Sequence, residues 1–200
     1  MLMALIPMAG LLLSAVLSGD VDAVVRFNPL RYAAWVIVVA ALLHPAGRAF
    51  FRSFSVSRVN WVMLALVGIA AGPLLVFASS NISLQRTVTD SHSGMGHYGF
   101  MAAFSYTVIA VGLLASLRPV GWRLTGWVAG LIPSLLGVTS VLYPDATSSL
   151  ALGWALAAVA WGVVFIAAAA PSKDAKSPIP IGSPDVVSKP ERQVEARLSD

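Results

Sequence analysis

The sequence contains no cysteine, and charged residues make up only 11% of its 200 residues. The absence of cysteine excludes disulfides, thiolate nucleophiles and metal or iron–sulfur sites built on cysteine. A soluble domain of this length carries about 25% charged residues, whereas here 58% of the residues are hydrophobic. The shortage of charge therefore predicts a chain that is largely embedded in a lipid bilayer.

Six apolar stretches account for this composition. Most are close to the roughly 20 residues that a helix needs to cross ~30 Å of hydrocarbon, and backbone polar groups in lipid must be hydrogen-bonded within their own segment. We therefore predict an all-α, polytopic transmembrane helical bundle of about six spans within residues 1–170. The predicted spans are 2–18, 32–50, 59–79, 98–117, 123–143 and 148–170.

Residues 171–200 differ sharply from the spans, because they are rich in Pro, Ser, Lys and Glu. A segment of this composition cannot bury enough apolar surface to offset the entropy lost on ordering it. We therefore predict a disordered tail that follows the membrane domain.

The connections between the predicted spans alternate in charge. Arg48, Arg52, Arg58, Arg118 and Arg123 lie on one side, together with the basic tail, and ten of the 13 Lys and Arg residues fall there. The positive-inside rule then places both termini and the tail in the cytoplasm. The net charge of +4 flanks the membrane, so we expect no nucleic-acid partner. Cysteine-free spans rich in Ala and Val favour a multi-pass protein of a bacterial plasma membrane.

Small residues recur at a spacing of four in three of the predicted spans. Such residues let two helix backbones approach closely, which drives helix association in lipid. We predict that they serve packing within the bundle, with docking of a partner subunit as the alternative. The predicted packing residues are Gly68, Gly72, Gly126, Gly130, Gly153 and Gly162.

No Asp, Glu, Lys or Arg falls in the central part of a predicted span. Ionisable groups inside the membrane are the usual mark of proton relays and ion pathways. Their absence argues against an ion-coupled transporter, a charged-ring channel and a proton pump. We find no catalytic constellation either, and predict that the protein is not an enzyme.

The densest polar cluster lies in the third connection, which we interpret as a loop over 79–99. Its end carries His92, Met95, His97 and Met101. Imidazole and thioether groups are ligands for copper, and imidazole also binds zinc. These four residues are therefore a candidate copper-like site on the outer face, although the same composition is typical of a polar loop that caps the bundle.

Two aromatic residues fall at mid-depth in the predicted bundle. Tyr106 and Trp161, with hydroxyl residues nearby, could line a small pocket for a quinone or a lipid. The alternative is that these polar groups bond to one another across helices.

The sequence thus favours a non-catalytic accessory protein or subunit that packs against other membrane proteins in the bilayer. Outer-face metal binding and a carrier of a neutral, lipid-like molecule remain the two alternatives.

Overall fold

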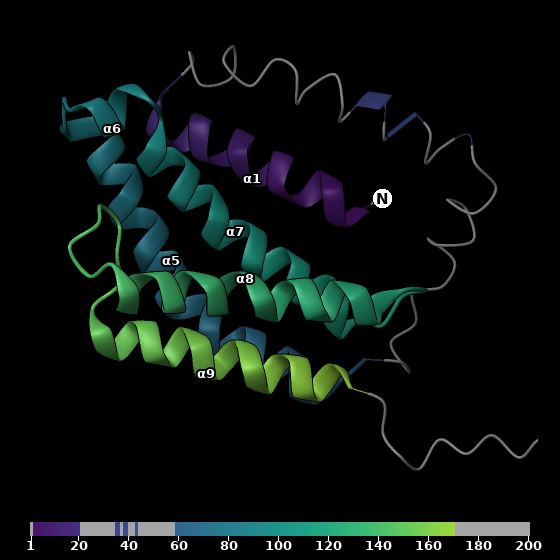
Figure 1. The fold of residues 1–200 in the computed structure, drawn as a ribbon. Helices are drawn as coiled ribbons and strands as arrows, with labels where there is room; N and C mark the ends of the chain where they lie inside the picture. Colours follow the sequence, from purple (N-terminus) through teal and green to yellow (C-terminus); the bar gives the residue numbers. More distant parts are fainter. Residues whose placement is uncertain (1, 21–34, 37, 40–42, 44–58, 171–200) are drawn as a thin grey trace, which may run out of the picture. The chain divides into compact units, whose positions relative to one another are not determined.

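The structure, a computed structural model, describes residues 2–20 and 59–170 and five positions between them, 35, 36, 38, 39 and 43. Every regular element in this described part is a helix (Figure 1). By its internal contacts the chain divides after Ala170, and the described residues belong to the first of the two units. The helices are α1 (Leu2–Ser18), α5 (Trp61–Thr87), α6 (Ser91–Gly94), α7 (His97–Ser116), α8 (Trp122–Leu142) and α9 (Leu152–Ala169).

Four of these helices are long and apolar enough to cross a membrane. They are α5, α7, α8 and α9, with 27, 20, 21 and 18 residues, and about 20 residues span the hydrocarbon layer. Helix α1 is also apolar but has 17 residues, shorter than this set. The all-helical prediction is confirmed for the described residues, and the four long helices indicate a membrane protein.

Two parts of the prediction lie outside the described residues. They are the tail, 171–200, and most of the second predicted span, 32–50. The described positions within that span are helical, and Trp35, Val36 and Leu43 among them are exposed. The number of six spans therefore stays a prediction.

The prediction for the third span, 59–79, is wrong at its C-terminal end, because α5 continues to Thr87. The residues that we interpreted as the start of a loop are helical because they contact α7. Ile82 packs with Ala102 of α7, and Gln85 accepts a hydrogen bond from the first turn of α7. The other described helices start and end close to the predicted spans, since their apolar length sets both ends.

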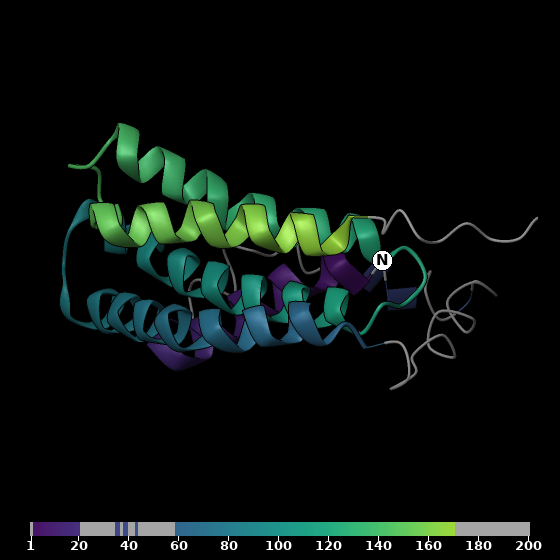
Figure 2. The same cartoon turned by 90° about the horizontal axis from the view of Figure 1, so that it is seen from below.

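Helix α7 occupies the centre of the bundle. It packs against α1, α5 and α8, while α8 and α9 form a closely packed pair (Figures 1 and 2). In the most apolar stretch of α7, 61% of the residues are buried, whereas in the corresponding stretches of α9 and α5 only 22% and 17% are buried. Helix α5 is therefore the longest and the least covered of the four.

The main core lies where α5, α7, α8 and α9 meet. Phe165 is fully buried and stacks on Trp161, with ring centroids 4.8 Å apart. The indole N–H of Trp161 donates to the carbonyl oxygen of Leu66 at 2.8 Å, which joins α9 to α5. The buried residues of this core are Met63, Val67, Val111, Ala115, Ala129, Phe165 and Ala169.

At one end of the bundle, which we call the Asn60 end, a single residue links three helices. The side-chain oxygen of Asn60 accepts from the backbone N–H of Met63 at 3.2 Å and so caps α5. Its side-chain amide donates to the carbonyl oxygen of Ala168 in α9 at 3.3 Å. Its backbone N–H donates to the carbonyl oxygen of Ser116 in α7 at 2.8 Å. The start of α5 and the ends of α7 and α9 therefore lie together.

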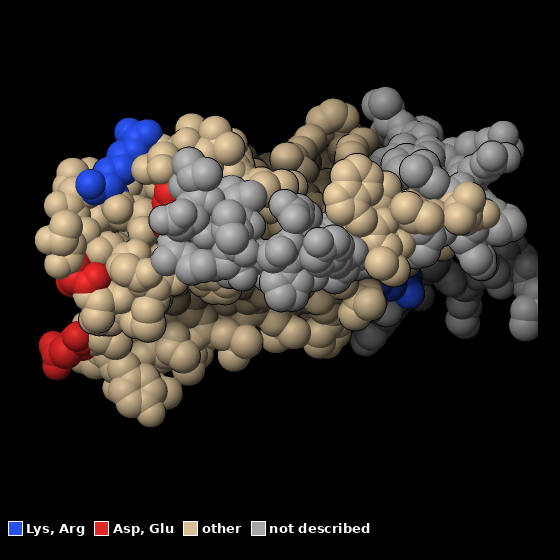
Figure 3. Space-filling model, turned by 90° about the horizontal axis from the view of Figure 1, so that it is seen from above, with Lys and Arg blue, Asp and Glu red and all other residues tan. Residues whose placement is uncertain are grey.

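At the opposite end, which we call the histidine end, α1 and α5 finish and α7 begins. The guanidinium of Arg86 donates to the carbonyl oxygen of Leu17. The Ser14 hydroxyl donates to the carbonyl oxygen of Gly99 at 2.5 Å. Acidic side chains gather at one end of the molecule (Figure 3). The residues that define the histidine end are Asp20, Asp90, His92, His97 and Asp145.

Candidate functional site

A one-turn helix, α6, positions the first histidine of the histidine end. The Asp90 carboxylate accepts a hydrogen bond from the backbone N–H of Ser93 at 2.7 Å, and the Ser93 hydroxyl accepts one from the Asp90 N–H at 3.1 Å. This reciprocal capping box fixes the start of the turn. Gly96 then adopts φ 76°, a conformation that glycine takes without steric cost, and α7 begins at His97. His92 and His97 therefore flank a tight turn.

The Asp90 carboxylate is engaged at both oxygens. Oδ1 accepts the capping hydrogen bond from Ser93. Oδ2 accepts a hydrogen bond from the hydroxyl of Tyr98 at 2.9 Å and lies 3.9 Å from Nδ1 of His92. The backbone hydrogen bond from Ser93, supported by the hydroxyl of Tyr98, holds the pKa of the Asp90 carboxyl below its ordinary value. The group is therefore a carboxylate at neutral pH and faces the first imidazole.

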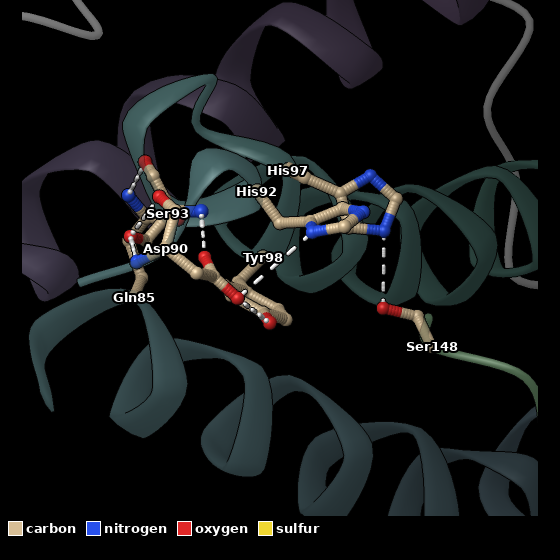
Figure 4. A network of polar contacts seen from close by, with 7 residues as sticks. All are labelled: Gln85, Asp90, His92, Ser93, His97, Tyr98 and Ser148. Carbon is tan, nitrogen blue, oxygen red and sulfur yellow. Dashed lines mark hydrogen bonds and ion pairs between the residues drawn. The ribbon is translucent and has the colours of Figure 1, made fainter. Parts of the chain in front are cut away.

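The two imidazole rings lie against each other (Figure 4). The ring centroids of His92 and His97 are 5.6 Å apart, with an interplanar angle of 68°. Nε2 of His97 lies 3.1 Å from the hydroxyl oxygen of Ser148, which belongs to the connection between α8 and α9 and has φ 70°. The histidine pair thus joins α6, α7 and the last connection of the bundle.

Gln85 connects this cluster to the end of α1, a role that no sequence pattern predicted. Its amide donates to the carbonyl oxygen of Ser93 at 2.8 Å and to Oδ2 of Asp20 at 3.3 Å. Its oxygen accepts from the backbone N–H of Gly99 at 3.1 Å. We expected a loop at this position, so the side chain had no predicted direction, whereas the extension of α5 points it at α7.

The predicted metal ligands fall into two groups. His92 and His97 are brought together, but Met101 is buried in the bundle with 9% of its surface exposed, and Met95 is 67% exposed. In the described ranges, no group of three or more His, Cys, Asp or Glu side chains is arranged to hold a metal ion. The four-ligand copper-like site therefore stays a prediction, and only its histidine pair has supporting geometry.

Three of the predicted packing glycines lie where helices touch. A methyl group added to Gly126 would come 2.9 Å from Cβ of Ala169, and one added to Gly130 would come 2.6 Å from the carbonyl oxygen of Gly162. A methyl group added to Gly162 would overlap the carbonyl oxygen of Gly130 and the hydroxyl oxygen of Ser134. Helices α8 and α9 can approach this closely only because these side chains are absent.

The other three predicted packing glycines are not in contact with the described helices. No described atom lies within 4 Å of a methyl group added to Gly68, Gly72 or Gly153. All three positions are exposed. If these glycines serve packing, their neighbour is not among the described helices.

Sequence reasoning missed three further close approaches. Gly10 of α1 meets the carbonyl oxygen of Ala103, Gly112 of α7 meets the side chain of Val67, and Gly137 of α8 meets the backbone of α9. Gly10 and Gly112 have no second glycine at a spacing of four. The pattern of paired glycines therefore could not find them.

Tyr106 and Trp161, the predicted pocket residues, belong to separate clusters. Tyr106 packs against Ala78, Ile82 and Ala102, between α5 and α7, whereas Trp161 packs on the main core. The indole N–H already donates to a backbone carbonyl. The shared pocket stays a prediction without supporting geometry.

Two buried polar atoms in the described bundle have no hydrogen-bond partner. They are the side-chain oxygens of Asn81 and Ser105, and both residues are at most 3% exposed. The amide of Asn81 donates to the carbonyl oxygen of Phe77 at 2.9 Å. An unpaired buried acceptor costs about 1–3 kcal/mol, so these two atoms do not stabilise the bundle.

Comparisons with protein-family models, with curated proteins and with solved structures found no match. Two geometric features therefore bear on function, the histidine pair and the open glycine pair of α5.

Proposed function

We propose that this chain is a non-catalytic membrane subunit that binds a transmembrane helix of another protein through one face of α5. The observation that carries the proposal is the open space beside Gly68 and Gly72, in the middle of the longest described helix. Only 17% of the residues in the most apolar stretch of this helix are buried.

The open glycines belong to a continuous stripe along α5, which we call the α5 free face. Its members recur every three or four residues and all are exposed, and this spacing places them on one side of a helix. Five of them are small. The residues of the α5 free face are Trp61, Ala65, Gly68, Gly72, Leu75, Ser79 and Ser83.

A stripe of small residues favours a helix partner over lipid. Lipid chains fill the space beside a large apolar side chain equally well, so contact with lipid does not require glycine. Close approach of two backbones does require it, because larger side chains keep two helices apart. Once the helices are close, dispersion contacts and polar contacts between them drive association in the membrane. Ser79 and Ser83 add hydroxyl groups to the same face, and Ser79 donates to the carbonyl oxygen of Val76 at 2.8 Å.

The distribution of charge supports a role without chemistry. Among the four long helices the charged residues are Arg86, in the last turn of α5, and Arg123, in the first turn of α8. Ionisable side chains within a membrane span usually mark transport or proton transfer, and the central parts of these helices carry none.

The arrangement of α1 and α5 supports six spans in this proposal. Helix α1 finishes at the histidine end, where Leu17 meets Arg86, whereas α5 starts at the Asn60 end. The apolar stretch 32–50, which lies mostly outside the described residues, has a suitable length for one crossing. With the Arg-rich connections inside, both termini would lie in the cytoplasm of a bacterial cell.

The proposal is tested by leucine substitutions on α5 and purification in mild detergent from native membranes. We expect a second membrane protein to co-purify in stoichiometric amount with the unaltered chain. Gly68→Leu and Gly72→Leu should abolish its recovery, because each side chain fills the space that the partner backbone needs. The amount of partner is measured by quantitative mass spectrometry.

Gly153→Leu is the matched control, because Gly153 also has open space but lies on α9. This variant should retain the partner. The proposal is wrong if no stoichiometric partner co-purifies, if the partner survives both α5 substitutions, or if the recovered partner is a second copy of this chain.

A further inference from the structure

Each imidazole of the histidine end has one ring nitrogen that faces a polar neighbour. Nδ1 of His92 faces the Asp90 carboxylate at 3.9 Å, and Nε2 of His97 lies 3.1 Å from the Ser148 hydroxyl. In the part of the chain that the structure describes, the remaining nitrogens, Nε2 of His92 and Nδ1 of His97, make no hydrogen bond. A neutral imidazole whose N–H is held on one side presents a lone pair on the other.

The rings already have the separation that a shared ligand requires. Their centroids are 5.6 Å apart. With metal–nitrogen bonds of about 2.1 Å, two imidazoles on one ion have ring centres about 5–6 Å apart. The centroid separation of the two rings therefore falls within the range for two imidazoles on one ion.

We propose that His92 and His97 bind a divalent transition-metal ion, Zn²⁺ or Cu²⁺, at the histidine end, through Nε2 of His92 and Nδ1 of His97. Water completes the coordination shell. This inference is independent of the partner proposed for α5, which lies on another surface of the bundle.

The Asp90 carboxylate is a positioning group in this site rather than a ligand. Both of its oxygens are engaged, by Ser93 and by Tyr98. A carboxylate behind the distal nitrogen of a metal-bound histidine fixes the tautomer and raises the basicity of the ring. The Asp90 carboxylate lies on this side of His92, 3.9 Å from Nδ1, and the Ser148 hydroxyl lies 3.1 Å from Nε2 of His97.

The donor set also selects the class of ion. Met101 is buried, whereas Met95 is exposed, so the two thioethers that would favour Cu⁺ lie in different surroundings. Imidazole nitrogen with water suits Zn²⁺ and Cu²⁺. The structure therefore favours a borderline divalent ion over the soft monovalent one.

The test uses the purified full chain without a histidine tag. Titration calorimetry with ZnCl₂ should show one ion per chain, and binding should be lost in His92→Ala and in His97→Ala. Asp90→Asn keeps a capping residue but removes the charge, so the affinity should fall about tenfold. The electron paramagnetic resonance spectrum of bound Cu²⁺ should show two imidazole nitrogens in the unaltered chain and in Asp90→Asn.

His44→Ala is the matched control, since the sequence has three histidines, and it should bind Zn²⁺ as the unaltered chain does. A thermal melt in detergent checks that each variant is folded. Binding that survives in both folded alanine variants of the pair, or that is lost in His44→Ala, would overturn the proposal. Loss of binding in folded Met101→Leu would overturn the donor set in favour of the thioether site.

Discussion

Helices α8 and α5 carry the same glycine spacing with two different outcomes. Gly126 and Gly130 lie in α8, Gly68 and Gly72 lie in α5, and a proline follows each pair within its helix. The α8 pair contacts α9, where a methyl group added to Gly130 would come 2.6 Å from the carbonyl oxygen of Gly162. The α5 pair faces open space. The spacing thus predicts that a backbone can be approached closely, but not which helix approaches it.

The difference follows from what each helix has beside it. Helix α9 is returned to α8 by a short connection, in which Ser140 accepts from the backbone N–H of Leu150 at 3.0 Å and the Ser149 hydroxyl donates to the carbonyl oxygen of Tyr143 at 2.7 Å. Helix α5 instead packs through its opposite side, where Val67 meets Gly112 of α7. Its glycines therefore face away from α7.

The largest expected effect is on the α8–α9 contact. Gly162→Leu should lower the free energy of unfolding by about 3 kcal/mol or more, because its side chain would overlap the backbone of α8. Gly68→Leu, the same change on the α5 free face, should alter it by no more than about 0.5 kcal/mol. Unfolding in detergent by denaturant, followed by circular dichroism, measures both. Equal losses would remove the distinction between the two glycine pairs.

The packed side of α5 gives the next effect. Asn60→Ala removes the cap of α5 and the link to Ala168 of α9, and should cost about 1–2 kcal/mol. The same unfolding measurement applies, with Asn60→Asp as the variant that keeps the cap but loses the amide donor. If Asn60→Asp is as unstable as Asn60→Ala, the link to α9 outweighs the cap.

A smaller loss is expected where α9 joins α5 in the core. Trp161→Phe keeps an aromatic ring on Phe165 but removes the indole hydrogen bond to Leu66. The loss should be about 1 kcal/mol, read as a small drop of the melting temperature in detergent. A loss near zero would show that this bond does not hold α9 on α5.

The smallest effect on stability is expected for Gly72→Leu, within about 0.5 kcal/mol, because nothing described contacts the added side chain. The same variant should nevertheless lose its partner in native membranes. A strongly destabilised Gly72→Leu would show that this face is covered by the protein's own chain, which would contradict the proposed docking surface.

Most of the described fold could be predicted from hydrophobic length alone. The exception is the end of α5, where Ser79, Asn81 and Gln85 suggested a loop and the helix continues. Local polarity favoured an earlier end, but burial of Ile82 and the hydrogen bond from Gly99 to Gln85 stabilise the longer helix. Those contacts come from α7, and no local pattern contains them.

The histidine end could be predicted only in part, for a related reason. The spacing of His92 and His97 in one polar segment suggested that they act together, and the structure brings their rings into contact. Ser148 lies far along the chain from both, so only folding shows that it meets His97. Met101 follows His97 by one turn of α7 but is buried, and the sequence pattern did not distinguish its exposure from that of His97.

The proposed role of this protein depends on contact between the α5 free face and another membrane protein. A photoreactive phenylalanine analogue in place of Leu75 tests it most directly, with the same replacement of Leu156 on α9 as control, since these leucines are 50% and 55% exposed. After irradiation of native membranes, we predict one discrete adduct with a different protein at position 75 and none at position 156. Labelling of lipid alone at both positions, or an adduct of two copies of this chain, would show that the α5 free face does not bind a different membrane protein.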